Sequence, residues 1–227
     1  MMILAIPALL ILTLVFGPQL WVHYVLKRHS VHRSDLQGTG GELAQHLIQR
    51  FELDAKVRMG AAGEDYYDPE KRVVSLSPEH YEGKSIAAVA VAAHEVGHAI
   101  QHKEKHPGFM RRQRRIRTAM AIERFSAIAL MVSPVIFLLT RVPQSTFLTA
   151  VIGAIGMLAV VLVQFMNLPV ENDASFNKAL PILEEGYLMI SDQPAARQVL
   201  KAAALTYVAA ALASLLNLGR WIAVLRR

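Results

Sequence analysis

Four long apolar segments limit the possible folds of this chain more than any other feature. They cover residues 2–26, 118–139, 147–166 and 202–225. A helix of about 20 mostly apolar residues is long enough to cross the hydrocarbon core of a bilayer. Hydrophobic residues make up 53% of the 227 residues, a larger share than an ordinary soluble domain contains. We therefore expect a mostly α-helical membrane protein with about four transmembrane helices.

Basic residues beside these segments predict how the chain is oriented. Lys27, Arg28 and Arg33 follow the first segment, and an arginine-rich block at residues 111–117 directly precedes the second. Loops rich in Lys and Arg remain in the cytoplasm. The first segment is then a retained span rather than a signal peptide, because its charge follows the apolar run. We expect residues 27–117 to face the cytoplasm.

Two basic features leave alternatives open. The arginine block has the composition to bind RNA or acidic lipid, but its place beside a span favours an orientation signal and no nucleic-acid partner. Arg220 near the end of the chain opposes the predicted orientation of the fourth segment. That segment is either a fourth span, the reading we favour, or a partly buried helix of the cytoplasmic domain.

The polar region between the first two spans predicts a small α+β domain. Its elements are a helix over residues 40–51, strands at 55–59 and 72–76, and a helix over 85–102. The domains expected are therefore 1–26, 27–117, 118–167, 168–200 and 201–227. The strand before the last helix is a candidate edge for pairing with an extended substrate, or an edge with only a structural role.

The helix predicted over residues 85–102 contains the sequence His94-Glu95-Val96-Gly97-His98. Residues four apart share one face of a helix, so His94 and His98 can bind one metal ion. Zn²⁺ held in this way lowers the pKa of a bound water to about 7, and a carboxylate such as Glu95 can then remove its proton. Gly97 either leaves room near the metal or is a packing position. The alternative to a metal site is a helix with satisfied core histidines.

A catalytic zinc site needs a third protein ligand, and the chain has no Cys. His102 lies about 12 Å along the helix axis from His94, too far for both to reach one ion. Glu171 is the preferred candidate, just past the third span, where we expect a helix to begin. Asp173 and Ser175 are candidates to orient a ligand. The remaining acidic candidates for the third ligand are Glu184, Glu185 and Asp192.

Several segments together resemble a known family. HEVGHAIQ, the arginine-rich entry to a membrane hairpin, LPVENDAS and LTYVAAAL occur in order, and they resemble the YugP-like neutral zinc metallopeptidases of bacterial membranes. The resemblance implies a membrane-embedded zinc endopeptidase with a cytoplasmic site. The chain is also similar, more distantly, to HtpX-like and CAAX-prenyl endopeptidases, whose Glu-x-x-Ala-Asp pattern supplies a metal ligand. Glu171 and Ala174 match that pattern, whereas Ser175 stands where the Asp would be, and Asn172 stands where an aromatic is expected.

These observations predict a membrane protein with a small zincin-like α+β cytoplasmic domain that carries the HExxH helix. We expect His94, His98 and Glu171 to bind Zn²⁺ and Glu95 to act as general base, with protein or peptide substrates. Tyr207 is either an oxyanion donor or an interfacial aromatic. The rival functions are a non-catalytic zinc-containing scaffold or chaperone partner, and a metal transporter. A detached fragment of residues 27–117 should bind zinc weakly and cleave nothing.

Overall fold

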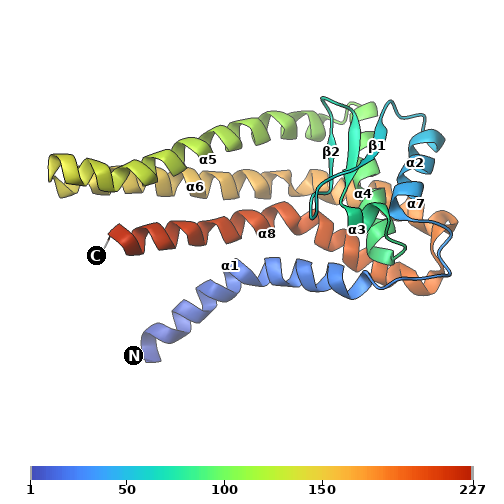
Figure 1. Cartoon of the computed structure of the whole chain (residues 1–227), viewed down its shortest axis with the longest axis horizontal. Helices are drawn as coiled ribbons and strands as arrows, with labels where there is room; N and C mark the ends of the chain where they lie inside the picture. Colours follow the sequence, from blue (N-terminus) through green and yellow to red (C-terminus); the bar gives the residue numbers. More distant parts are fainter. Residues whose placement is uncertain (1, 226–227) are drawn as a thin grey trace. The chain divides into compact units, whose positions relative to one another are not determined.

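Helices make up most of the chain, together with one small sheet (Figure 1). The computed structural model describes residues 2–225. Its contacts divide the chain into two units. The first, the helical unit, comprises residues 1–19, 111–167 and 207–227, and the second, the mixed unit, comprises residues 20–110 and 168–206. The general prediction of a mostly helical chain with a small α+β region is confirmed.

Helices α5 (Pro107–Thr140) and α6 (Pro143–Asn172) are joined by two residues and form a hairpin (Figure 1). Within the helical unit, a Cβ added at Gly153 would collide with Leu130, and one added at Gly156 would collide with Ser126. The two glycines therefore lie where the helices approach closely.

Two stretches among the described residues are long and apolar enough to cross a membrane, Pro107–Thr140 and Phe147–Tyr187. They contain the predicted second and third spans. Helices α1 (Met2–His29) and α8 (Gln193–Leu225) contain the other two apolar segments, and α8 begins nine residues before its segment. That these two helices also cross a membrane stays a prediction.

The sheet of the mixed unit has three short strands, β1 (Lys56–Met59), β2 (Tyr66–Asp68) and β3 (Val73–Leu76). Their order is β1-β3-β2, with β1 parallel and β2 antiparallel to β3. The two predicted strands are confirmed to within a residue, whereas β2 was not predicted. Because β3 is the central strand, it has no edge to offer a substrate, and the predicted edge pairing at residues 72–76 is wrong.

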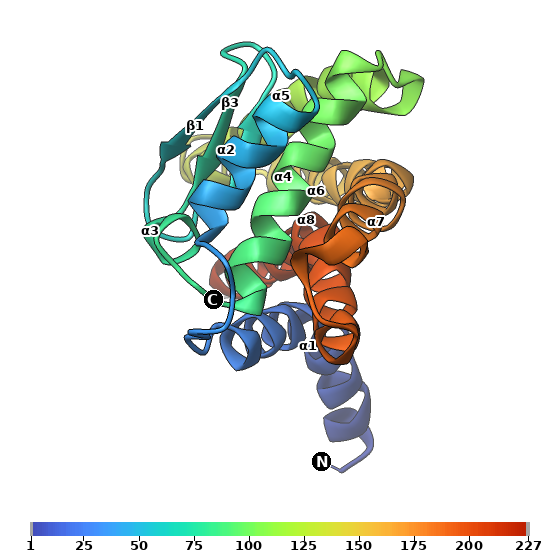
Figure 2. The ribbon, with the colours of Figure 1, turned by 90° about the vertical axis from the view of Figure 1, so that its right-hand side faces the viewer.

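Helices α2 (Gly40–Arg50) and α4 (Ile86–Lys103) lie side by side (Figure 2). A capping box of Thr39 and Glu42 starts α2, and the side chain of Ser85 accepts a hydrogen bond from the backbone N–H of Ala88 to start α4. Every residue of α4 from Ile86 to Gln101 is buried. Both predicted helices are confirmed.

Helix α3 (Pro78–Tyr81) is tied to the loop between β1 and β2 by a half-buried acid, Asp65. Asp65 accepts a 2.8 Å hydrogen bond from the backbone N–H of Ser77, and its other oxygen lies 2.8 Å from Nδ1 of His80. Burial opposes ionisation of Asp65, but the hydrogen bond and charge of His80 outweigh it, so the pKa of Asp65 is lowered.

The chain stays helical past Pro169 and leaves the helical conformation only around residues 186–189. Helix α6 continues past Pro169 to Asn172 and is followed by the π-helix η1 (Asp173–Ala179), α7 (Leu180–Ile182), the π-helix η2 (Leu183–Tyr187) and the 3₁₀-helix η3 (Ile190–Asp192). Glu171 is therefore in the last turn of α6 and not at the start of a helix. The helix dipole does not explain its position, so its neighbours on α4 must.

Candidate metal centre

Two histidines of α4 present their rings on one face of the helix. The centroids of His94 and His98 are 4.8 Å apart, and the residues are only 2% and 3% exposed. The i, i+4 spacing in a regular helix produces this pairing. The face predicted to bind a metal is thus formed and lies inside the mixed unit.

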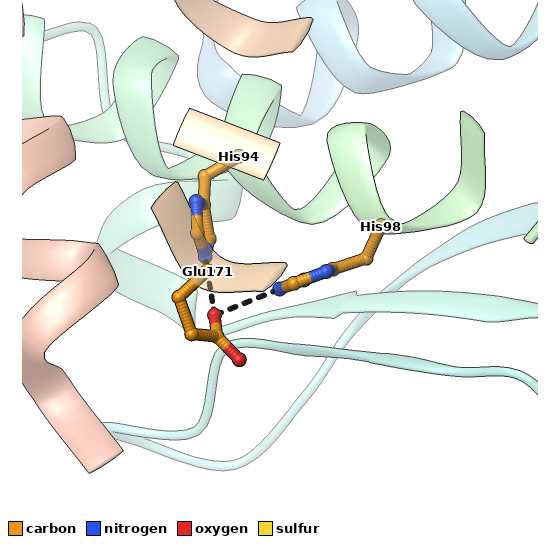
Figure 3. A group of neighbouring side chains, drawn as sticks. All are labelled: His94, His98 and Glu171. Atoms are coloured by element: carbon orange, nitrogen blue, oxygen red, sulfur yellow. Dashed lines mark hydrogen bonds and ion pairs between the residues drawn. The ribbon is translucent and has the colours of Figure 1, made fainter. Parts of the chain in front are cut away.

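Glu171 meets both histidines (Figure 3). Its Oε2 lies 3.4 Å from Nε2 of His94 and 3.1 Å from Nε2 of His98, and Glu171 is 1% exposed. One potential ligand atom from each of the three residues lies within 4.8 Å of the other two. The fold therefore brings together the three residues predicted as ligands.

The far side of the His94 ring contacts a hydroxyl group of η1. Ser175 Oγ lies 2.9 Å from Nδ1 of His94 and donates its own proton to the carbonyl of Leu200 at 3.0 Å. Because the hydroxyl proton is used in this way, Oγ must accept the proton of His94 Nδ1. The Nε2 atom that faces Glu171 is then unprotonated in the neutral ring.

The far side of the His98 ring contacts Gln101, which is fully buried. The amide nitrogen of Gln101 donates to the carbonyl of Val170 at 2.9 Å and to Asp173 Oδ2 at 2.7 Å. Its oxygen consequently points to Nδ1 of His98, 3.0 Å away, and accepts that proton. Gln101 thus orients His98, and Asp173 acts only through Gln101.

Gln101 was not among the site residues predicted from the sequence. Gln101 follows His98 by three positions, and residues three apart share a helix face. This spacing could have identified Gln101 as a partner of the metal-binding histidine.

These hydrogen bonds direct three electron-pair donors at one another: Nε2 of His94, Nε2 of His98 and Oε2 of Glu171. Such buried atoms repel one another unless a cation lies between them. Tetrahedral Zn²⁺ with bonds of about 2.0–2.1 Å places its ligand atoms about 3.3 Å apart, close to the 3.1 and 3.4 Å separations of Glu171 from the histidines. The residues present therefore fit zinc.

Gly97 lies between the two histidines in the sequence, at the contact with η1. A Cβ there would be 2.8 Å from the carbonyl oxygen of Ala174. Of the two readings of Gly97, the structure favours the packing position, because the missing side chain lets η1 and Ser175 approach α4.

The remaining candidate residues lie in different surroundings. Glu95 is buried in α4 with 7% exposure, and its role as a base stays a prediction. His102 is outside the ligand group, as predicted, and its Nδ1 bonds to the hydroxyl of Tyr67 at 2.8 Å. Tyr207 belongs to the helical unit, where its ring centroid is 5.1 Å from the guanidinium carbon of Arg112. Its suggested part in catalysis also stays a prediction.

The three other acidic candidates for the third ligand form ion pairs elsewhere. Glu184 bonds to Arg197 at 2.6 Å, Glu185 to Arg50 at 2.7 Å, and Asp192 to Arg33 at 3.0 Å. None of them belongs to the group around the histidines in the described part of the chain.

Comparison with known proteins places this site in a family. The family described as "Putative neutral zinc metallopeptidase" matches residues 1–226. A protein of Bacillus subtilis described as "Putative membrane protease YugP" is 34% identical over 215 residues, which cover 92% of each chain. No solved structure matches the chain. The match over nearly the full length confirms the resemblance read from the sequence, and the chain belongs to this family of zinc metallopeptidases.

Proposed function

We propose that this chain is a membrane-embedded zinc endopeptidase that hydrolyses peptide bonds at the cytoplasmic face of a bacterial inner membrane. The observation that carries the proposal is the convergence of Nε2 of His94, Nε2 of His98 and Oε2 of Glu171 in a buried site. Membership of a zinc metallopeptidase family supports the same metal and the same class of reaction.

In this mechanism His94, His98 and Glu171 hold the metal. Bound zinc supplies a Lewis acid that polarises the scissile carbonyl and lowers the pKa of a water molecule to about 7. Glu95 takes the proton of the attacking water and passes it to the leaving amine. Ser175 and Gln101 keep the unprotonated nitrogen of each histidine toward the ion. Tyr207 remains the candidate donor to the oxyanion.

In the proposed topology the chain crosses the membrane four times, through α1, α5, α6 and α8. The zincin-like domain lies in the cytoplasm. The support for this topology is the two apolar helical stretches, the basic residues that flank the spans, and the description of the Bacillus subtilis relative as a membrane protease. A site close to a bilayer suits membrane proteins or misfolded segments as substrates.

Replacing Glu95 by Gln tests the function. The detergent-purified full chain should bind one zinc ion and cleave casein, and a chelator should stop the cleavage. Glu95→Gln should keep the zinc and lose cleavage, because the amide cannot accept the proton of the water. Glu82→Gln, an exposed substitution of the same kind, is the control and should retain activity.

Casein cleavage that survives in Glu95→Gln contradicts the role of Glu95. A wild-type chain that binds zinc and cleaves neither casein nor peptides supports the alternative, a non-catalytic zinc-containing scaffold.

A further inference from the structure

A groove with a volume of about 630 Å³ lies beside the C-terminal half of α4, within the mixed unit. His102 and Ala99 of α4 line it, together with Tyr67 of β2 and the connection between α2 and β1. His102 lies one turn after His98, about 6 Å along the helix axis. The ring of Phe109 lies between them, with centroids 5.9 Å from His98 and 5.7 Å from His102. The groove therefore begins one helical turn from the metal centre, with the buried ring of Phe109 beside both histidines.

The floor of the groove is apolar. Leu53, Tyr67 and Ala99 contribute buried side chains, and Met110 at the margin is 46% exposed. A surface of this kind gains free energy when an apolar group displaces water from it.

Two of the cations at the rim already have partners. Arg72 is paired with Asp54. The ammonium group of Lys103 donates to the carbonyls of Phe51 and Glu52, at 2.7 and 3.2 Å. The lining contains one further cation, Lys105, and two acids, Glu52 and Asp54, so its net charge is one positive. With so small a net charge, the apolar floor decides what the groove accepts.

One polar group on the wall has a defined orientation. Burial raises the pKa of Tyr67 to about 12, so its hydroxyl keeps its proton. Burial and then the charge of Arg72 lower the pKa of His102, so its ring is neutral at pH 7. Among the described residues the hydroxyl of Tyr67 has one hydrogen-bond partner, Nδ1 of His102 at 2.8 Å. We therefore assign the hydroxyl as the donor, which places the ring proton of His102 on Nε2. That N–H has no hydrogen-bond partner among the described residues.

The backbone around the groove is held in an uncommon conformation. Glu52, Arg72 and Lys105 have φ values of 47°, 53° and 53°, and all three line the groove. The described chain contains one other non-glycine residue with positive φ, Arg141. A non-glycine residue in this region costs roughly 1–2 kcal/mol, and such residues gather at binding sites.

We propose that this groove is a substrate subsite that takes an apolar side chain one or two residues from the scissile bond, with Nε2–H of His102 donating to a substrate carbonyl. The inference rests on the proposed peptidase function. Extended peptide advances about 3.3–3.6 Å per residue, so the 6 Å step from His98 to His102 corresponds to one or two residues. The class of substrate is an extended polypeptide with a large apolar residue near the cleaved bond.

The test uses two quenched fluorescent peptides composed of Gly, Ala and Ser, which differ only in carrying one Leu or an Ala at that place. The zinc-loaded wild type should cleave the Leu peptide with a kcat/KM about tenfold or more above that of the Ala peptide. Ala55→Phe, which fills the groove, should reduce this ratio to near one. Ala62→Phe, on an exposed loop, should leave the ratio unchanged. The ratio does not depend on the fraction of active enzyme.

A second variant tests the donor. His102→Phe keeps a ring of similar size and removes Nε2–H, so kcat/KM should fall about twofold to tenfold for both peptides while their ratio stays high. The matched change His32→Phe at an exposed residue should have no effect. An undiminished kcat/KM in His102→Phe overturns the role of His102.

Binding separates failure of the subsite from failure of the peptidase function. In zinc-loaded Glu95→Gln, fluorescence anisotropy should show about tenfold tighter binding of a labelled Leu peptide than of its Ala counterpart, and adding Ala55→Phe should abolish the difference. A wild type that cleaves neither peptide, with the binding preference intact, refutes the peptidase and keeps the subsite. Equal binding of both peptides, or a Leu/Ala ratio that Ala55→Phe leaves unchanged, overturns the subsite.

Discussion

Replacing Gln101 by Leu would remove three hydrogen bonds from the interior of the metal centre while nearly preserving the volume of the side chain. The change leaves the Nδ1–H of His98 and the carbonyl of Val170 without their partner, and both residues are 3% exposed. Asp173 is better placed to adapt, because it also accepts a hydrogen bond from Asn177 and is only half-buried.

Each buried group left unsatisfied costs about 1–3 kcal/mol, so the two together cost about 2–6 kcal/mol. Part of this cost destabilises the fold, and part weakens metal binding because His98 is no longer held in one orientation. Loss of such an orienting partner lowers metal affinity by about 10- to 100-fold, which corresponds to about 1.4–2.8 kcal/mol. We expect zinc affinity to fall by this factor.

Competition with a chelator of known affinity, at pH 7 in detergent, measures the zinc dissociation constant. Thermal unfolding of the metal-free protein measures the loss of stability separately. Gln49→Leu makes the same change at an exposed position of α2 and should leave both quantities unchanged. If Gln101→Leu binds zinc within twofold of the wild type, the hydrogen bonds from Gln101 do not position His98 and the reasoning is refuted.

Three further changes test other contacts. Gly97→Ala should force the carbonyl of Ala174 away from α4 and lower zinc affinity at least tenfold by chelator competition; wild-type affinity would show that the close approach is unnecessary. Ser175→Ala should remove the acceptor of His94 Nδ1 and weaken zinc binding about 10- to 100-fold, whereas Ser175→Thr, which retains the hydroxyl, should lose less. The lowered pKa of Asp65 stabilises the fold above its unfolded pKa of about 3.9, and this contribution disappears as the pH falls through the folded value. The melting temperature of the wild type should therefore approach that of Asp65→Asn between pH 5 and pH 3, and a constant difference would contradict the lowered pKa.

The metal helix could be predicted from the sequence because its signals are local. An uninterrupted apolar run after Ser85 predicts a buried helix, and the spacing of His94 and His98 fixes their common face. Glu171 was harder to predict, since it lies 73 positions after His98. Its selection depended on its place after a span and on a family pattern.

Features determined by distant contacts could not be read from the sequence in the same way. Strand β2 has three residues, and its pairing with β3 depends on the sheet. A helix was expected to begin at Glu171, yet α6 continues through Pro169 to Asn172. The wide turns of η1 bring Ser175 to His94 and to Leu200, 81 and 25 positions away, and no local pattern specifies such a register.

The separation of 73 positions between His98 and Glu171 also sets an order of events during synthesis. A ribosome adds about 5–20 residues per second, so both histidines leave it about 4–15 s before the glutamate does. During this interval the nascent chain contains Glu95 and two zinc ligands but not the third. If the proposed function is right, the peptidase stays inactive until the hairpin of α5 and α6 has been made, and the emerging chain is spared from its own active site.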